Sequence, residues 1–208
     1  MQQEGTRKRQ AVADLPVSSV PLALRSLLRH FGRDHHNLTR RLGGSGPEEK
    51  MMDTSVYYHE AGHAVMAMAM RFTVNEICYA PSDTSLGYVQ WEYPTYLTES
   101  SRTWVVLVFL SGIAAERIFC QKQGLPEPNN SKNYQTDLRQ VGLHLKELQT
   151  PKSIDDYSSI AENFLRQPAL WEKVESFAAL LIQESAINGQ NWLKEVAEKV
   201  PRFSDFYC

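Results

Sequence analysis

The stretch Tyr57-Tyr58-His59-Glu60-Ala61-Gly62-His63-Ala64-Val65 decides how the rest of the chain is interpreted. It contains an HExxH motif, in which His59 and His63 are four residues apart and Glu60 directly follows the first histidine. Residues i and i+4 lie on one face of an α-helix, so both imidazoles can reach a single ion while Glu60 is directed at water bound to it. A catalytic site of this kind needs one more protein ligand and one open position. The stretch therefore predicts a metal site that a distant residue completes.

The length and charge distribution predict one main domain with a basic extension. The chain has 208 residues, of which 42% are apolar, enough to bury one core. Residues 1–50 hold nine Lys and Arg against five Asp and Glu, whereas residues 51–208 hold thirteen against nineteen. We expect residues 1–47 to be a partly disordered basic arm with a short amphipathic helix at Val20–Phe31, and residues 48–208 to be the main domain. Nucleic-acid binding by the arm is not favoured, because its excess of positive charge is small and lacks interleaved aromatic residues.

Cysteine usage and the apolar runs bear on the compartment. Cys78, Cys120 and Cys208 are widely spaced and form no CxxC pair, which argues against a disulfide framework and for a reducing compartment. The longest apolar run, Trp104–Ala115, is shorter than the roughly 20 residues that span a bilayer, so it predicts a core helix. We expect a cytoplasmic protein without a secretory signal or a transmembrane segment. The arginine-bearing start is also compatible with an organellar transit peptide.

The hydrophobic pattern predicts a mostly α fold with a small β hairpin or sheet. A buried helix containing the motif is expected to end near Met70 and to begin at one of three capping residues, Asp53, Thr54 or Ser55. Two strands are expected next, at Val74–Tyr79 and Gly87–Trp91. Further helices are expected at Thr98–Cys120, Thr136–Leu148, Ile154–Arg166, Ala169–Gln183 and Gln190–Val200.

Gly62 lies inside the predicted motif helix, where glycine costs about 1 kcal/mol relative to alanine. A glycine kept at such a position usually has a packing reason. We expect another backbone to approach the helix closely at Gly62, near the metal. The methionines that follow, Met66, Met68 and Met70, are expected to fill the core.

The third metal ligand has five candidates. Two neutral imidazoles and a carboxylate are a donor set that suits zinc and preserves its Lewis acidity. Asp137 and Glu116 are favoured, because each lies in or at the start of a helical segment that could pack against the motif helix. The weaker candidates are Asp83 in a turn between the strands, Glu92 and His144.

Five sequence blocks, in order, resemble the peptidase domain of the FtsH-type, membrane-anchored AAA+ zinc proteases. The likeness covers about residues 48 to 200. The first block, Val56–Val65, carries the full HEAGHA string after a tyrosine. The others are similar to that family's Leu-Gly-Tyr strand, its Gly-Gly-Arg-Ala-Ala-Glu helix, its Asn-Asp pair and its closing turn, and they are Leu86–Tyr88, Ser111–Glu116, Asp137–Leu138 and Ile187–Trp192.

The resemblance implies a zinc site formed by His59, His63 and Asp137, with Glu60 as the catalytic base. Under that assignment Glu116 becomes either a residue that accepts the outer N–H of a zinc-ligating histidine or one that only packs between helices. The chain departs from the family pattern before Asp137 and around Ser111–Ile113, which affects substrate contacts and ring assembly rather than metal binding. It also contains no GxxxxGK[ST] phosphate loop, and its first 47 residues are too short for an ATPase module. We therefore expect the peptidase half alone, without a nucleotide site.

These observations predict a zinc metalloendopeptidase that hydrolyses unfolded or flexible polypeptides. An extended substrate would add as a strand to Val74–Tyr79 or to Gly87–Trp91. A separate AAA+ ATPase chain is a candidate partner, and a homo-oligomer is compatible with the sequence. The alternative is a non-proteolytic, zinc-containing binding or adaptor module that docks a partner such as a ring ATPase.

Overall fold

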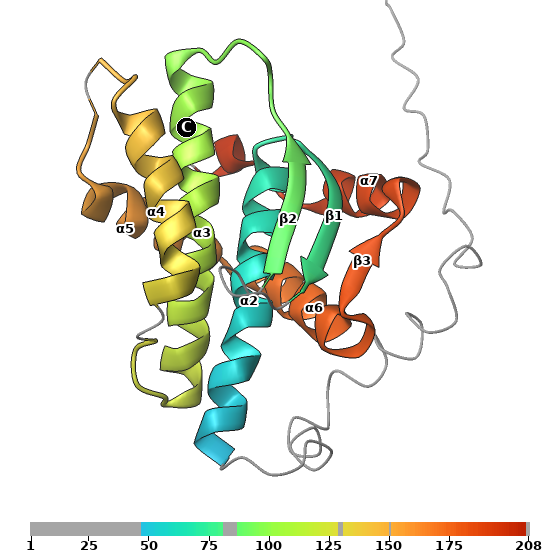
Figure 1. Ribbon diagram of the computed structural model, residues 1–208. Helices are drawn as coiled ribbons and strands as arrows, with labels where there is room; N and C mark the ends of the chain where they lie inside the picture. The colour runs from blue at the N-terminus through green and yellow to red at the C-terminus, as the bar shows by residue number, and fades with distance from the viewer. Residues whose placement is uncertain (1–46, 81–86, 129–130, 150, 207–208) are drawn as a thin grey trace, which may run out of the picture. The chain divides into compact units, whose positions relative to one another are not determined.

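The computed structural model of the protein describes residues 47–80, 87–128, 131–149 and 151–206. Within these residues the fold is mostly α with one small antiparallel sheet, as the sequence predicts (Figure 1). The predicted arm, residues 1–47, falls outside them except for Pro47. In chain order the elements are α2 (Pro47–Ala69), β1 (Thr73–Tyr79), β2 (Gly87–Glu92), α3 (Glu99–Gln123), α4 (Ser131–Leu145), α5 (Ile154–Leu165), α6 (Pro168–Glu184), β3 (Ala186–Asn188), α7 (Gln190–Lys199) and the 3-10 turn η3 (Phe203–Asp205).

Helix α2 carries the HExxH motif through the centre of the molecule. It packs against α3, α6, α7 and the two strands β1 and β2, and every residue from Ala64 to Met70 is buried. The prediction that Met66, Met68 and Met70 fill the core is confirmed. The predicted start of the helix is wrong, because α2 begins at Pro47, before the three predicted caps. Proline is favoured in the first turn of a helix, where its missing N–H has no partner to lose.

Helix α3 lies beside α2 and supplies the second half of the core (Figure 1). It begins after Thr98, whose side chain accepts a hydrogen bond from the backbone N–H of Ser101, and it ends at Gly124, whose φ of 67° favours glycine. In the described part of the chain, α3 alone is long and apolar enough to cross a membrane by length and composition. Its most apolar 18-residue window is 78% buried inside the protein, as a core helix requires.

The sheet has the order β2-β1-β3, with both pairings antiparallel. β1 and β2 match the predicted strands to within one residue at each end. β3 was not predicted, since its three residues, which directly precede Gly189, give too short a pattern to be recognised. Because β1 pairs with β2 on one side and with β3 on the other, it has no free edge from Glu76 to Cys78. Of the two strands considered for substrate addition, β2 is the one at the edge of the sheet.

Helices α4 and α5 pack on α3, and α6 packs on α2. The four helices α4 to α7 agree with the predicted ranges except at their ends, where α4 begins five residues early and ends three residues early. α5 begins at a capping box, in which Ser153 and Asp156 satisfy each other's backbone N–H groups. The contact of α4 with α3 brings Asp137 over the motif helix.

Candidate metal centre

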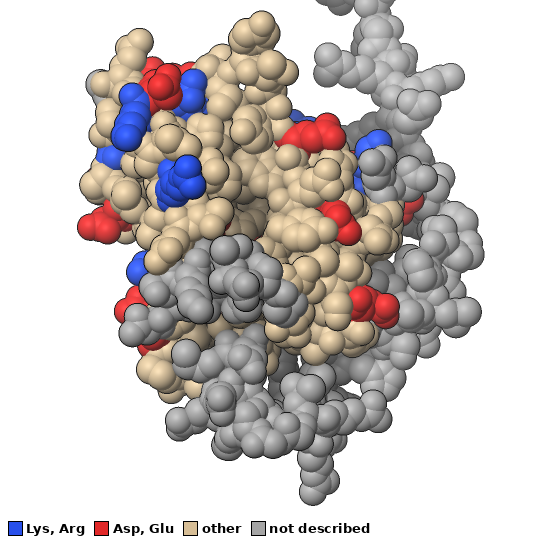
Figure 2. Space-filling model, viewed as in Figure 1, with Lys and Arg blue, Asp and Glu red and all other residues tan. Residues whose placement is uncertain are grey.

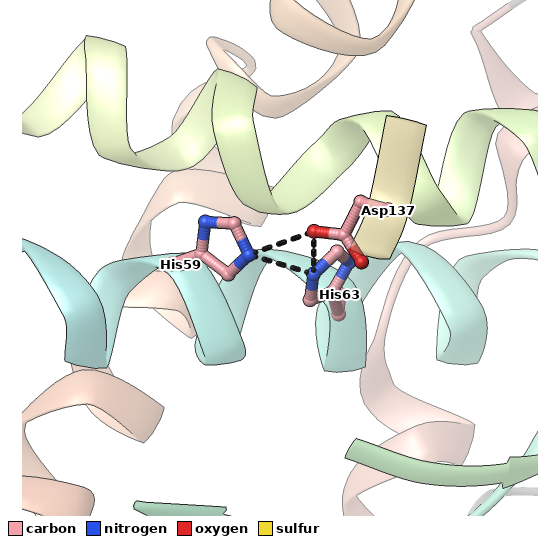
Figure 3. A group of neighbouring side chains, drawn as sticks. All are labelled: His59, His63 and Asp137. Atoms are coloured by element: carbon pink, nitrogen blue, oxygen red, sulfur yellow. Dashed lines mark hydrogen bonds and ion pairs between the residues drawn. The ribbon is translucent and has the colours of Figure 1, made fainter. Parts of the chain in front are cut away.

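His59, His63 and Asp137, the His-His-Asp group, form a buried cluster that could hold a metal ion. The two imidazoles project from one face of α2, and Asp137 reaches them from α4 (Figure 3). The two Nε2 atoms are 3.0 Å apart, and Oδ2 of Asp137 lies 3.0 Å from Nε2 of His59 and 3.2 Å from Nε2 of His63. The three atoms thus form a nearly equilateral triangle.

The outer nitrogens of the two histidines fix which ring nitrogen carries the proton. Nδ1 of His63 lies 2.7 Å from the carbonyl oxygen of Val108, which can only accept, so this Nδ1 is the donor. Nδ1 of His59 lies 3.3 Å from Oε2 of the Glu116 carboxylate and is likewise placed to donate. In the neutral form each histidine therefore presents an Nε2 lone pair to the centre of the triangle, where Asp137 adds a carboxylate oxygen. Three acceptors directed at one point repel one another unless a cation or a proton lies between them.

A proton on His59 is the alternative to a cation. Burial alone would lower the pKa of His59, but its hydrogen bonds to Asp137 and Glu116 outweigh burial and raise the pKa to about 10. Burial alone would raise the pKa of Asp137, but its electrostatic interaction with His63 and its hydrogen bonds with both histidines outweigh burial and lower the pKa. A cation and this proton would compete for the same nitrogen.

Three side chains around His59 hold its ring in place. Glu116 accepts a 2.6 Å hydrogen bond from the Ser55 hydroxyl besides its contact with His59. Although burial opposes it, the hydrogen bond with His59 keeps the pKa of Glu116 low, so this carboxylate is charged. The ring of Tyr134 stacks on His59, with centroids 5.9 Å apart and planes 9° apart. The contact expected between Glu116 and an outer histidine N–H is present, and it orients the ring.

Two glycines allow α2 and α3 to approach closely at the centre. A Cβ on Gly62 would lie 2.5 Å from the carbonyl oxygen of Ser111 and 2.6 Å from Cβ of Ala115, so the predicted close approach at Gly62 is confirmed. A Cβ on Gly112 would lie 2.4 Å from Nε2 of His63 and 2.7 Å from Nε2 of His59. Glycine at 112 thus leaves open the space beside both Nε2 atoms.

Glu60 lies on α2, and its carboxylate is buried beside the start of β2. A Cβ on Gly87 would lie 2.7 Å from Oε1 of Glu60, which shows how closely the β2 backbone approaches this carboxylate. Burial raises the pKa of Glu60 above its usual value, against the lowering effect of His59 and His63. The first residue of the edge strand and the glutamate of the motif are therefore neighbours.

The donor set and its spacing fit a divalent transition metal. Tetrahedral sites with bonds of 2.0–2.1 Å place their ligand atoms roughly 3.3 Å apart, close to the 3.0–3.2 Å between the three atoms here. Two nitrogens and one carboxylate oxygen suit zinc. A group of three protein ligands also leaves a fourth position for a small molecule.

The other candidates for the third ligand do not join the group. Glu116 contacts the outer nitrogen of His59 instead of the shared centre. Glu92 is exposed on β2 and accepts a hydrogen bond from Asn75. His144 lies against the rings of Phe109 and Tyr93. Asp83 falls outside the described residues.

Sequence reasoning did not identify several residues that shape the centre. A glycine within the most apolar part of α3 is an unusual choice, so Gly112 carried a signal that could have been recognised. Tyr134 attracted notice only as a departure from the family pattern, and the Val108 carbonyl gives no signal in the side-chain sequence.

In comparisons with known proteins, no protein-family model matches the chain, and no curated protein matches it either.

Proposed function

We propose that the protein is a zinc-dependent metalloendopeptidase that hydrolyses unfolded or flexible polypeptides, related in design to the FtsH-type peptidases. The observation that carries the proposal is the convergence of two Nε2 lone pairs and one carboxylate oxygen on one buried point, with a glutamate next to the first histidine. This is the donor set and order of residues that HExxH hydrolases use. In this proposal His59, His63 and Asp137 hold zinc.

Zinc, when bound, would supply Lewis acidity, which acidifies water and polarises a peptide carbonyl. The protein residues do the remaining work. Glu60 accepts a proton from water at a carboxylate oxygen and returns it to the leaving amine. Burial raises the pKa of Glu60 above its usual value, which makes its carboxylate a stronger base. Glu116 and the Val108 carbonyl hold the two imidazoles in the tautomer that keeps both Nε2 atoms available.

The edge strand β2 supports an extended polypeptide as substrate. β2 begins at Gly87 beside Glu60 and pairs with β1 along one side only among the described strands. An extended chain can add to such an edge through its main-chain hydrogen bonds, which gives affinity that does not depend on sequence. Because only extended segments can pair in this way, the proposed substrates are already unfolded or flexible. Without a phosphate loop in the sequence, unfolding of compact substrates would fall to a separate ATPase chain.

The test compares wild-type protein with the Glu60→Gln variant on unfolded casein and quenched peptides, with zinc and with a chelator. We expect the wild type to cleave in zinc alone, and we expect Glu60→Gln to lose at least roughly a hundredfold in rate while retaining about one zinc ion per chain. Glu172→Gln is the matched control, because it makes the same change at an exposed carboxylate of α6. Retained cleavage by Glu60→Gln would remove Glu60 as the base. Stoichiometric zinc without cleavage by the wild type would favour the alternative, a zinc-containing binding module.

A further inference from the structure

Four aromatic side chains form a closed ring of contacts beside the metal centre. The distances between ring centroids are 5.0 Å for Trp91 and Tyr93, and 6.3 Å for Tyr93 and His144. They are 6.1 Å for His144 and Phe109, and 5.6 Å for Phe109 and Trp91. Trp91 belongs to β2, Tyr93 follows β2, Phe109 belongs to α3 and His144 belongs to α4. This aromatic wall therefore joins the edge strand to α4 and rests on α3.

β2 and α4 both lead from the metal centre to the aromatic wall. β2 runs from Gly87, next to Glu60, to Trp91 in the wall. α4 runs from Asp137, in the His-His-Asp group, to His144 in the wall. Figure 2 shows the surface hollowed between the part over α3 and α4 and the part over β2, and the described atoms that border the hollow are mostly uncharged.

The wall presents accessible and uncharged surface. Tyr93 is 44% exposed, and Trp91, Phe109 and His144 are partly exposed. Burial, together with the charge of Arg102, lowers the pKa of His144 against the opposing effect of Glu147, so its imidazole is neutral at neutral pH. Nδ1 of His144 is buried and has no hydrogen-bond partner within the described part of the chain. An accessible, mostly apolar face of this kind is typical of a pocket for a side chain.

The spacing sets which substrate residue would reach the wall. Asp137 and His144 are seven residues apart on one helix, which is about 10 Å at 1.5 Å per residue. An extended chain covers that distance in roughly three residues at 3.3 Å each. Both strand pairs in this sheet are antiparallel, and an added strand antiparallel to β2 would run from the wall towards the metal centre. The residues at the wall would then precede the cleaved bond.

We propose that the aromatic wall is a subsite for an apolar, preferably aromatic, side chain about three residues before the cleaved peptide bond. The inference rests on the proposed function, since it takes an extended polypeptide to lie along β2. The subsite would give the enzyme a preference for particular substrate side chains. The edge strand alone gives no such preference, because main-chain pairing accepts any sequence.

The test uses quenched peptides that are identical except at the third residue before the cleaved bond. Mass spectrometry of the products identifies which bond is cleaved. We expect phenylalanine there to raise kcat/KM roughly tenfold or more over aspartate, as burial of an apolar side chain in a pocket does. Tyr93→Lys, a change at a largely exposed position, should reverse the order in favour of aspartate by charge attraction. Tyr96→Lys is the matched control, because it makes the same change at a tyrosine that is 89% exposed in the same loop and lies outside the wall. The preference of this variant should stay that of the wild type.

Binding separates this inference from the proposed function. The affinity of each peptide for the zinc-loaded Glu60→Gln variant is measured by fluorescence anisotropy, which needs no hydrolysis. Equal affinity for the phenylalanine and aspartate peptides, or a Tyr93→Lys variant with the wild-type order of preference, overturns the subsite. If the wild type cleaves no peptide but the binding preference and its reversal are both present, the subsite stands and the proposed hydrolysis fails. His144→Ala, which removes the opposite side of the wall, should lower the preference in the same assay and serves if Tyr93→Lys does not fold.

Discussion

Gly112→Ala should weaken metal binding by at least about a hundredfold while leaving the protein folded. The added Cβ would lie 2.4 Å from Nε2 and 2.6 Å from Cε1 of His63, and 2.7 Å from Nε2 of His59. Ordinary contacts of a Cβ begin at 3.4 Å, so the overlap is about 1 Å on one ligand and slightly less on the other. The methyl group would also occupy the space beside the two nitrogens that an ion needs.

The rings cannot move aside without losing the site. His63 is fixed by its 2.7 Å hydrogen bond to Val108, and His59 by its contact with Glu116. Rotation of either ring breaks these contacts and turns its Nε2 away from the centre. Loss of an orienting contact alone typically costs tenfold to a hundredfold in metal affinity, so displacement of a ligand should cost at least about a hundredfold, or about 2.8 kcal/mol. Helix propensity acts in the opposite direction, since alanine is favoured over glycine by about 1 kcal/mol in a helix.

The measurement is competition for zinc between the protein and a chromophoric chelator, together with the thermal midpoint of the chelator-treated protein. Gly142→Ala is the matched control, because Gly142 lies in α4 and a Cβ there meets nothing within 4 Å. We expect the control to bind zinc as the wild type does. A Gly112→Ala protein that binds zinc with wild-type affinity and stoichiometry would refute the placement of Gly112 against both imidazoles.

Four further outcomes are expected. The pKa of His59 is raised from 6.5 to about 10. Its proton therefore stabilises the metal-free fold fully below pH 6.5, and this stabilisation is lost as the pH rises through 10. The thermal midpoint of the chelator-treated protein should fall over the same pH range. For the same reason zinc binding between pH 7 and 9 should release about one proton. Calorimetry in buffers of different ionisation enthalpy measures this release, and a result of no release would contradict the presence of a proton on His59 in the metal-free protein. Glu116→Gln should weaken zinc binding by about tenfold to a hundredfold, because an amide orients His59 without the carboxylate charge, and unchanged affinity in the chelator competition would show that Glu116 only packs. Gly62→Ala should destabilise the protein by roughly 2 kcal/mol or more in urea unfolding, because the new Cβ meets backbone of α3 at 2.5 Å; an unchanged midpoint would mean that the two helices separate without cost.

Periodicity located the helices because most of them bury one continuous face. α5, α6 and α7 bury residues at helical spacing, and their starts are marked by Ser153, Pro168 and Gly189. The start of α2 was placed too late, because three residues suited to capping lie inside the helix and outweighed the proline that begins it. β3 was missed since three residues cannot show a period, and its pairing with β1 depends on a contact that the local sequence does not encode.

The motif predicted the two histidines and Glu60 directly, since a helix alone places all three. Asp137 could not be chosen over Glu116 by the same reasoning, because each carboxylate lies in or at the start of a helical segment that, from its sequence, could pack against the motif helix. The structure separates them by the nitrogen of His59 that each contacts, Nε2 for Asp137 and Nδ1 for Glu116. That distinction depends on the relative positions of three helices, which composition and spacing do not contain.

The central position of β1 has a consequence for how the chain folds. Its partner β2 follows within a few residues, but Ile77 meets its other partner, Ile187, only across a long stretch of intervening chain. Closing so large a loop is slow compared with forming a hairpin, because the loop entropy must be overcome before the contacts form. During synthesis, α2, α3 and α4 would emerge and could bring the His-His-Asp group together before β3 leaves the ribosome. We therefore expect refolding to show two kinetic phases, with zinc binding acquired in the first and protection of the β1 amides that face β3 in the second.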